Sequence, residues 1–296
     1  MKRYRFIFLL LVIFSIFLWN CNPSDSGDNN NNNDNGGGDN GSNTSSSPYI
    51  IGHNCTDISQ IPDNWINQVK EQLKIHYAHT SHGEQIVVGL QRLSNGTSQT
   101  SVALKSQSSR YRFYHDYCCV PAGQNGLRMM DGQQFDYCET YVTPDLYWEN
   151  ETGLNWTRYV LRNFDVNVSL WAWCCQLDYY SESETQNYLD RMSQLETEFP
   201  DIMFIYMTGN SQSSEQNRYD RNNQIREYCR DNNKFLFDFA DLDCWYNGEQ
   251  HTENGIPMEH PQYHGDEAGH TTYTSCDNKG RAFWWLLARM AGWSGE

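Results

Sequence analysis

The sequence predicts an α/β domain over residues 49–296 with a parallel β-sheet at its centre, and two observations carry this prediction. Short runs rich in β-branched and aromatic residues alternate with longer segments in which apolar residues recur at helical spacing. Strands that alternate with helices of this length are joined by right-handed crossovers, which make the strands parallel. The segment also has the length of one domain and enough Trp, Tyr and Phe to build a sizeable core.

The first expected elements place a serine between a strand and a helix. Apolar residues recur at helical spacing from Trp65 to Leu73 and predict a helix. A strand is expected over 74–79, and a second helix over 83–93, where the helical spacing resumes. Ser81 therefore lies where a strand turns into a helix.

The middle of the domain lacks a regular pattern, and the alternation returns after it. Residues 94–155 hold paired cysteines and aromatic residues with few periodic cues, so we expect an irregular insert there. The elements expected beyond it are helices over 156–164, 184–198 and 216–232 and strands over 166–173, 202–207 and 234–239. Residues 241–276 are again irregular, and a closing helix over 279–290 is expected to pack Trp284 and Trp285 on the sheet.

The N-terminal residues predict export and a surface anchor. Residues 1–21 carry three basic residues and then an apolar run that is too short to span a bilayer, which is the layout of a secretory signal peptide. Cys21 ends this run and resembles the lipidated cysteine of a bacterial lipoprotein. Residues 22–48 are almost only Asn, Asp, Gly and Ser and predict a flexible tether. We expect a lipoprotein at the outer membrane or cell surface, held to the membrane by its lipid, or a periplasmic or secreted protein if lipidation fails.

The charge of the domain argues against a nucleic-acid partner. The whole chain has a formal net charge of -16, and residues 1–48 contribute three cations and four Asp, so about -15 belongs to the domain. Phosphate backbones would be repelled by such a surface.

The cysteines predict disulfides between distant residues and at least one unpaired thiol. Nine of the ten cysteines follow Cys21, which is an odd number. The neighbours Cys118/Cys119 and Cys174/Cys175 are not expected to close on themselves, because adjacent Cα atoms lie about 3.8 Å apart and disulfides prefer about 4.4 to 6.8 Å. Each is expected to reach a distant partner.

Polar residues follow three of the expected strands. In an open α/β sheet the functional groups gather outside the carboxyl ends of the strands. Ser81 follows the first of these strands, Cys174 and Cys175 the second, and Asn210 the third, so we expect their turns to meet at one edge. A serine that opens a helix lies beside unpaired backbone N–H groups, which favour negative charge as an oxyanion requires. Gly83 is expected to let a substrate approach closely.

Three segments then suggest a family, and in chain order they are IHYAHTSHGEQI, then NVSLWAWCCQLDYY with YLDRMSQLETEFPDIMFIYMTGN, then GHTTYTSCDNKGRAFWWLLARMAGW. They resemble the blocks of a divergent branch of the SGNH (GDSL-like) hydrolases over most of 75–293. The resemblance implies a flavodoxin-like, three-layer fold with helices on both faces of the parallel sheet. It also implies the hydrolysis of an ester, commonly an acetyl group on a carbohydrate.

The resemblance assigns the catalytic roles by position. It implies that Ser81, in H-T-S-H-G where the family usually has G-D-S, is the nucleophile and that His270 in the last block is the base. Asn210 in T-G-N is implied to be the asparagine of the oxyanion hole. The acid three residues before His270 is Glu267 and Asp266 stands one further back, so either can be the carboxylate that orients the imidazole.

The remaining donors and the substrate contacts complete this hypothesis. The backbone N–H groups of Ser81 and Cys175 would join Asn210 in holding the oxyanion, with Cys175 standing where the family has a glycine. Trp245 and Tyr246 are the candidates for stacking on a sugar, whereas Trp171 and Trp173 share one strand face and are expected in the core. The expected partner is a glycan or a small molecule that carries an ester, and no cofactor or metal is required.

Two metal-binding alternatives concern the histidines. His76 and His79 are an odd number of residues apart on a strand and point to opposite faces, which argues against a zinc site with His82. The loop that carries His251, His260, His264 and His270 near Asp266 can fold its ligands together, and a metal-dependent hydrolase would use it.

The simpler interpretations assign these residues no chemistry. Ser81 would then be only a helix cap, and Asn210 only a turn residue. The protein would in that case be a non-catalytic surface lipoprotein that binds glycans through its aromatic residues.

Overall fold

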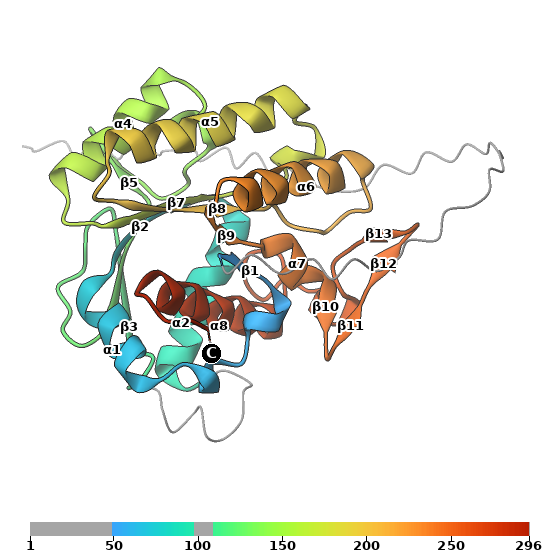
Figure 1. The fold of residues 1–296 in the computed structure, drawn as a ribbon, viewed down its shortest axis with the longest axis horizontal. Helices are drawn as coiled ribbons and strands as arrows, with labels where there is room; N and C mark the ends of the chain where they lie inside the picture. The colour runs from blue at the N-terminus through green and yellow to red at the C-terminus, as the bar shows by residue number, and fades with distance from the viewer. Residues whose placement is uncertain (1–48, 98–108, 296) are drawn as a thin grey trace, which may run out of the picture. The chain divides into compact units, whose positions relative to one another are not determined.

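A seven-stranded, fully parallel β-sheet lies at the centre of the computed structural model, which describes residues 49–97 and 109–295 (Figure 1). The expected signal peptide, Cys21 and the tether lie outside the described residues. In spatial order the strands are β1 (Ile50–Ile51), β9 (Phe235–Phe237), β8 (Met203–Met207), β7 (Val168–Ala172), β2 (Lys74–His79), β4 (Leu127–Asp131) and β3 (Phe113–Tyr117).

The order of the five inner strands is that of a doubly wound sheet. Numbered along the chain as β2, β4, β7, β8 and β9, they stand in the order 2-1-3-4-5, which is the flavodoxin-like order. β1 and β3 extend this sheet at its two edges. The α/β prediction is therefore confirmed, together with its parallel sheet.

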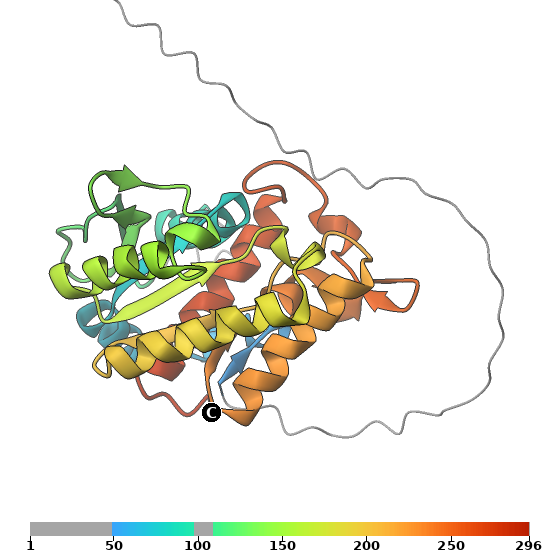
Figure 2. The ribbon, with the colours of Figure 1, turned by 90° about the horizontal axis from the view of Figure 1, so that it is seen from above.

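Helices cover both faces of the sheet and make three layers (Figures 1 and 2). One face carries α1 (Asp63–Gln72), α2 (Glu84–Asn95) and α8 (Tyr273–Met290). The other face carries α4 (Glu151–Asn163), α5 (Glu182–Glu198) and α6 (Gln216–Asp231). Figure 2 looks onto the face that α4, α5 and α6 cover. Among the described residues, none of the helices has the length and apolarity needed to cross a bilayer.

The core consists of apolar strands packed against one face of each helix. All five residues of β7 are buried, as expected for a strand that is covered on both faces. Trp171 and Trp173 are buried, as expected, and the Trp173 ring lies 4.8 Å from the ring of Tyr188 on α5. On the other face α8 crosses α2 so closely that a Cβ atom on Gly280 would lie 2.5 Å from the carbonyl carbon of Gly89. Only glycine permits this approach.

The largest difference from the expected elements lies between residues 94 and 155. This region contributes two strands of the sheet, β3 and β4, and a short hairpin of β5 (Gln133–Gln134) and β6 (Cys138–Glu139). The local sequence does not mark these strands, because Leu127–Asp131 has no β-branched residue and Phe113–Tyr117 ends at an exposed edge. Helix α8 also begins six residues before the expected start at 279.

The segment after β9 contains short elements where no regular pattern was expected. Helix α7 (Phe239–Cys244) leads into two small hairpins, formed by β10 (Trp245–Tyr246) with β11 (Glu249–Gln250) and by β12 (Thr252–Glu253) with β13 (Ile256–Pro257). A 3₁₀ turn over Pro261–Tyr263 precedes the loop that leads into α8.

One disulfide is present among the described residues, between Cys118 and Cys138 with Cα atoms 5.5 Å apart. Cys118 thus pairs with a distant cysteine rather than with Cys119, as expected. Cys174 and Cys175 do not reach distant cysteines. Their sulfur atoms lie 3.8 Å apart instead, at the end of β7.

Candidate functional site

The candidate site lies where the chain reverses its winding direction, between β2 and β7. These strands are neighbours in the sheet, and His79 at the end of β2 stands opposite Ala172 at the end of β7. The chain leaves β2 toward α2 on one face and leaves β7 toward α5 on the other (Figures 1 and 2). In doubly wound sheets ligands bind in the crevice at such a switch point.

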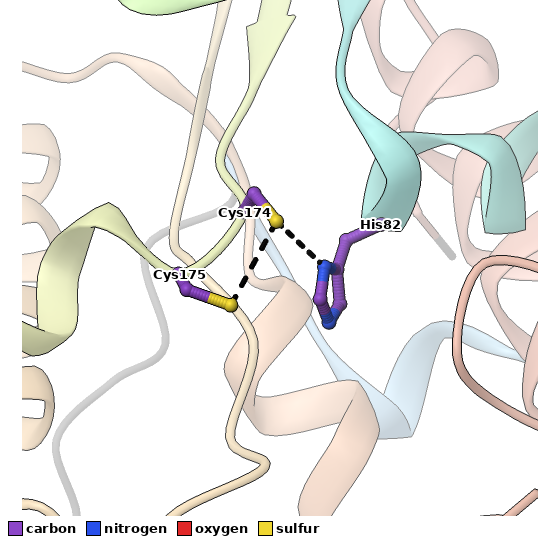
Figure 3. Close-up of side chains that lie close together, drawn as sticks. All are labelled: His82, Cys174 and Cys175. Atoms are coloured by element: carbon purple, nitrogen blue, oxygen red, sulfur yellow. Dashed lines mark hydrogen bonds between the residues drawn. The ribbon is translucent and has the colours of Figure 1, made fainter. Parts of the chain in front are cut away.

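Side chains from the two strand ends converge on one sulfur atom. Ser81, in a 3₁₀ turn over Ser81–Gly83, places its Oγ 3.6 Å from Cys174 Sγ. The Nδ1 atom of His82 lies 3.0 Å from the same sulfur, and Cys175 Sγ lies 3.8 Å from it (Figure 3). The ring of His82 is buried.

Gln212 fixes the orientation of His82 from its other side. Its Oε1 lies 2.8 Å from His82 Nε2, while its Nε2 donates to the carbonyl oxygen of His270 at 2.7 Å. Because the amide nitrogen faces that carbonyl, the amide oxygen faces His82, and Nε2 of the ring must donate to it. The Nδ1 atom of a neutral His82 therefore presents a lone pair toward Cys174.

The protonation of Cys174 and His82 is linked. The hydrogen bond between Cys174 and Cys175, together with the hydrogen bond and charge of His82, outweighs burial and holds the pKa of the Cys174 thiol well below its ordinary value. Burial opposes a charge on His82, but the contact with Cys174 raises the pKa of the imidazole. Within this pair the proton therefore favours the ring over the sulfur.

Asn210 links the third strand end to the same place. It follows β8, and its Nδ2 donates to the carbonyl oxygen of Cys174 at 2.8 Å. Its Oδ1 accepts from the backbone N–H of Gln212 at 3.1 Å. The three turns after β2, β7 and β8 therefore lie together at the carboxyl edge of the sheet.

The loop before α8 brings His270 to this edge. A Cβ atom on Gly269 would lie 2.8 Å from the carbonyl oxygen of Ser81, so the turn that contains Gly269 packs directly on the serine backbone. The His270 ring lies 5.0 Å from the ring of His82, and its side chain is 54% exposed. The hydroxyl of Ser81 contacts the sulfur of Cys174. Proton transfer from Ser81 to His270 therefore stays a prediction.

The two candidate carboxylates next to His270 have different surroundings. Asp266 Oδ1 lies 3.8 Å from Nδ1 of His270 and is well exposed. Glu267 Oε2 accepts a hydrogen bond from the backbone N–H of Tyr273 at 2.8 Å, at the first residue of α8. Asp266 is thus the carboxylate that stands near the imidazole, and Glu267 caps the helix.

Ser81 also borders a cavity of about 270 Å³. Glu84, Tyr117 and Tyr141 line it, and the buried carboxylate of Asp131 lies at its side. Burial raises the pKa of that carboxyl, but hydrogen bonds from His115 and His79 outweigh burial and lower it. A negative charge is therefore retained beside the cavity.

Gly83 serves packing in this structure. A Cβ atom on Gly83 would lie 2.2 Å from the Cβ of His79, so the residue allows the turn after β2 to fold onto the strand. The space beside Gly83, which was expected to admit a substrate, is filled by the side chain of His79.

Trp245 and Tyr246 lie on a different cavity, of about 370 Å³, which Asn278 and Arg281 also line. The Trp245 ring stacks on the ring of His53 at 4.0 Å. The predicted sugar contact thus borders a different cavity from the one that Ser81 lines.

Among the described residues, neither of the two histidine sets weighed as a metal site forms a group of close ligand atoms. His76 contacts Ser169 Oγ at 2.9 Å and His79 contacts Asp131 at 2.9 Å. In the part of the chain that the structure describes, the one group of three or more close metal-ligand atoms is His82, Cys174 and Cys175, and it includes no histidine of the 251–270 loop.

The roles of His82 and Gln212 are not among the roles predicted from the sequence. His82 was grouped with His76 and His79 by its spacing, although it follows a strand end just as Cys174 does. Gln212 lies two residues beyond Asn210 in the turn after β8. Extending the rule on strand ends by two residues would have found both.

The chain matches no protein-family model, no curated protein and no solved structure. The resemblance to the SGNH hydrolases therefore rests on the three sequence segments within 75–293 alone.

Proposed function

We propose that this protein hydrolyses an ester, with Ser81 as the nucleophile and an acyl group on a carbohydrate as the substrate class. The observation that carries the proposal is the packing of the Gly269 turn on Ser81. This packing brings the exposed imidazole of His270, from the loop before α8, to the end of β2. A hydroxyl at a switch point, an accessible imidazole and several N–H donors are the parts that serine hydrolysis needs.

His270 is the base in this proposal because the nearer imidazole is engaged. Both ring nitrogens of His82 have partners, Nδ1 with Cys174 and Nε2 with Gln212. The His270 ring is more than half exposed and can turn about its side-chain bonds toward the serine when a substrate binds. Asp266 stands within 3.8 Å of the imidazole and orients it.

The reaction then follows in two steps. Ser81 Oγ attacks the ester carbonyl while His270 takes the hydroxyl proton, and His270 returns that proton to the departing alcohol. Water, deprotonated by His270, next attacks the acyl-serine, and His270 returns that proton to Ser81 Oγ as the bond to the acyl group breaks and the acid leaves. The oxyanion would be held by the N–H groups of Ser81 and Cys175 and by Asn210, whose Nδ2 uses one N–H on Cys174 and has a second to donate.

The cavity beside Ser81 supports a small, polar substrate. Its volume of about 270 Å³ suits an acyl group with part of a sugar ring, and Tyr117 and Tyr141 offer exposed aromatic surface at its border. Asp131 and Glu84 offer hydrogen-bond acceptors for sugar hydroxyls.

The test compares Ser81→Ala with the unchanged chain on an aryl acetate and on an acetylated sugar. We expect the variant to lose turnover while its circular dichroism and unfolding curve are unchanged, and a fluorophosphonate to label Ser81 in the unchanged chain. Ser183→Ala, at an exposed serine on α5, is the matched control. Full turnover by Ser81→Ala would refute the assignment, and loss of turnover only in Cys174→Ala would move the nucleophile to the thiol.

A further inference from the structure

We propose that His82, Cys174 and Cys175 bind one Zn²⁺ ion, with the fourth coordination position open beside the Ser81 hydroxyl. This inference is independent of ester hydrolysis, because the ion can be measured without any substrate.

The spacing of the ligand atoms fits a tetrahedral ion. The nitrogen of His82 and the two sulfur atoms all lie within 4.8 Å of one another. Two thiolates bound at about 2.3 Å to a tetrahedral zinc ion lie about 3.8 Å apart, and Sγ of Cys174 and Sγ of Cys175 lie 3.8 Å apart (Figure 3). The His82–Cys174 distance of 3.0 Å would open by about 0.5 Å to reach the spacing of a bound nitrogen and sulfur.

The local backbone explains how two consecutive cysteines point to one place. Consecutive side chains on a strand point to opposite faces. Cys175 stands just beyond β7 with φ −94° and ψ 6°, where the extended chain ends and a 3₁₀ turn over Gln176–Asp178 begins. The change of direction brings the two sulfur atoms to the side that faces His82 (Figure 3).

The surrounding contacts prepare the nitrogen ligand. Gln212 accepts from Nε2 of His82, so Nδ1 is the ring nitrogen directed at Cys174, and it becomes a ligand when its proton is released on metal binding. Histidines that bind metals almost always donate their other ring N–H to such a partner. Asn210 holds the carbonyl of Cys174 and steadies the turn that carries both cysteines.

The donor set selects the ion and leaves one position open. Two thiolates and an imidazole suit zinc, whereas magnesium and calcium require oxygen ligands. Three protein ligands with an open fourth position are the arrangement of catalytic rather than structural zinc sites. Ser81 Oγ lies 3.6 Å from Cys174 Sγ, close to the spacing of an oxygen and a sulfur on the same ion.

A disulfide between Cys174 and Cys175 is the competing fate of the two thiols. Its formation requires the sulfur atoms to approach from 3.8 Å to about 2.05 Å, with adjacent Cα atoms closer together than disulfides prefer. It would also leave unexplained why His82 is turned toward the pair.

The test measures zinc binding by the full chain after reduction and removal of metals. We expect one Zn²⁺ per chain by calorimetry, and Co²⁺ in its place should give thiolate charge-transfer bands and the visible absorption of a tetrahedral ion. Cys174→Ser, Cys175→Ser and His82→Gln should each weaken zinc binding by more than about 10- to 100-fold, which is the loss when only an outer-shell partner of a ligand is removed. The matched controls are Cys119→Ser, an exposed thiol that also stands beside another cysteine, and His264→Gln, an exposed histidine.

Each result decides the proposal. Equal affinity in the unchanged chain and in the Cys174 and Cys175 variants, or Co²⁺ spectra without thiolate bands, would overturn it. A Cys174–Cys175 disulfide in chain purified without reductant, combined with no zinc uptake after reduction, would do the same. Unfolding curves of each variant show whether lost binding reflects lost structure, and Cys175→Ser carries the test if His82→Gln fails to fold. Zinc binding by a chain without esterase activity would leave this inference standing and remove the proposed function.

Discussion

The imidazole of His82 lies 3.0 Å from the sulfur of Cys174, although the two residues follow different strands and come from opposite sides of the switch in winding direction. This contact occupies the position where a doubly wound sheet presents its ligand. Ser81 and Asn210 both touch Cys174 as well, the first through its sulfur and the second through its carbonyl. Cys174 is therefore the residue at which the three strand ends meet.

Replacing the proposed base should abolish turnover without disturbing the fold. His270 has φ 66°, a left-handed conformation that asparagine tolerates, so His270→Asn keeps the backbone of the loop. We expect kcat on an aryl acetate to fall on the order of 1,000-fold. The control is His264→Asn, an exposed histidine beside Glu259. If His270→Asn turns over at the rate of the unchanged chain, another base serves Ser81.

Substitutions of the two carboxylates near His270 should change different properties, kcat for Asp266 and stability for Glu267. Asp266→Asn should lower kcat, because its carboxylate stands near the imidazole, and leave the unfolding free energy unchanged. Glu267→Ala should instead cost about 1 kcal/mol of stability through loss of its contact with the start of α8, with little change in kcat. Urea unfolding and initial rates on the same preparations check both outcomes. The reverse pattern would make Glu267 the orienting residue.

Asn210→Ala should lower kcat by on the order of 100-fold or more if its amide holds the oxyanion. The same variant loses two hydrogen bonds, to the carbonyl of Cys174 and from the N–H of Gln212, so a loss of stability is expected as well. Rates measured well below the unfolding midpoint separate the two effects. Asn232→Ala, at an exposed helix end, is the control. An unchanged kcat would leave Asn210 with its structural role alone.

The buried carboxyl of Glu259 should make stability depend on pH. Burial first, and the nearby charge of Asp243 second, raise the pKa of Glu259 to about 7, although Lys279 opposes the shift. A carboxyl whose pKa is higher in the folded chain favours folding while it is protonated. Its contribution is therefore complete below its unfolded value near 4.5 and is lost as the pH rises through about 7.

The expected change in the unfolding free energy between pH 5 and pH 8 is a loss of about 2 kcal/mol. Glu259→Gln, which is uncharged at both pH values, should show a smaller loss over the same interval. Urea unfolding of both chains at the two pH values provides the comparison. A parallel decline in both would place the pH dependence in other groups.

The disulfide between Cys118 and Cys138 should stabilise the edge of the sheet. It joins the end of β3 to the hairpin of β5 and β6, with 20 residues of sequence separation. Cys138→Ser should lower the unfolding free energy by about 3 kcal/mol, since the unfolded chain is no longer constrained. Cys119→Ser, next to the bridge but outside it, should have little effect. Equal stability of the two variants would contradict this role.

The sequence predicted those parts of the fold whose local pattern and tertiary environment agree. The bounds of β2 follow from a buried run between two helical patterns, and α5 was expected within two residues of its start. The strand Leu127–Asp131 was missed because a strand in mid-sheet is specified by its neighbours on either side, and no β-branched residue marks it.

The candidate site was predicted at the level of strand ends and missed at the level of contacts. The rule on carboxyl ends placed Ser81, Cys175 and Asn210 at one edge, and the structure brings their turns together. The contact between His82 and Cys174 depends on how a turn after one strand faces a turn after another, and no spacing within the sequence encodes that.

The close crossing of α2 and α8 at Gly89 and Gly280 determines when, during synthesis, the contacts around Ser81 can form. The final helix follows directly on the loop that carries His270, and Gln85 at the beginning of α2 donates to the carbonyl oxygen of Gly269 in that loop. A polypeptide still being synthesised would thus complete the loop that packs on Ser81 only after its final helix had formed and docked on α2.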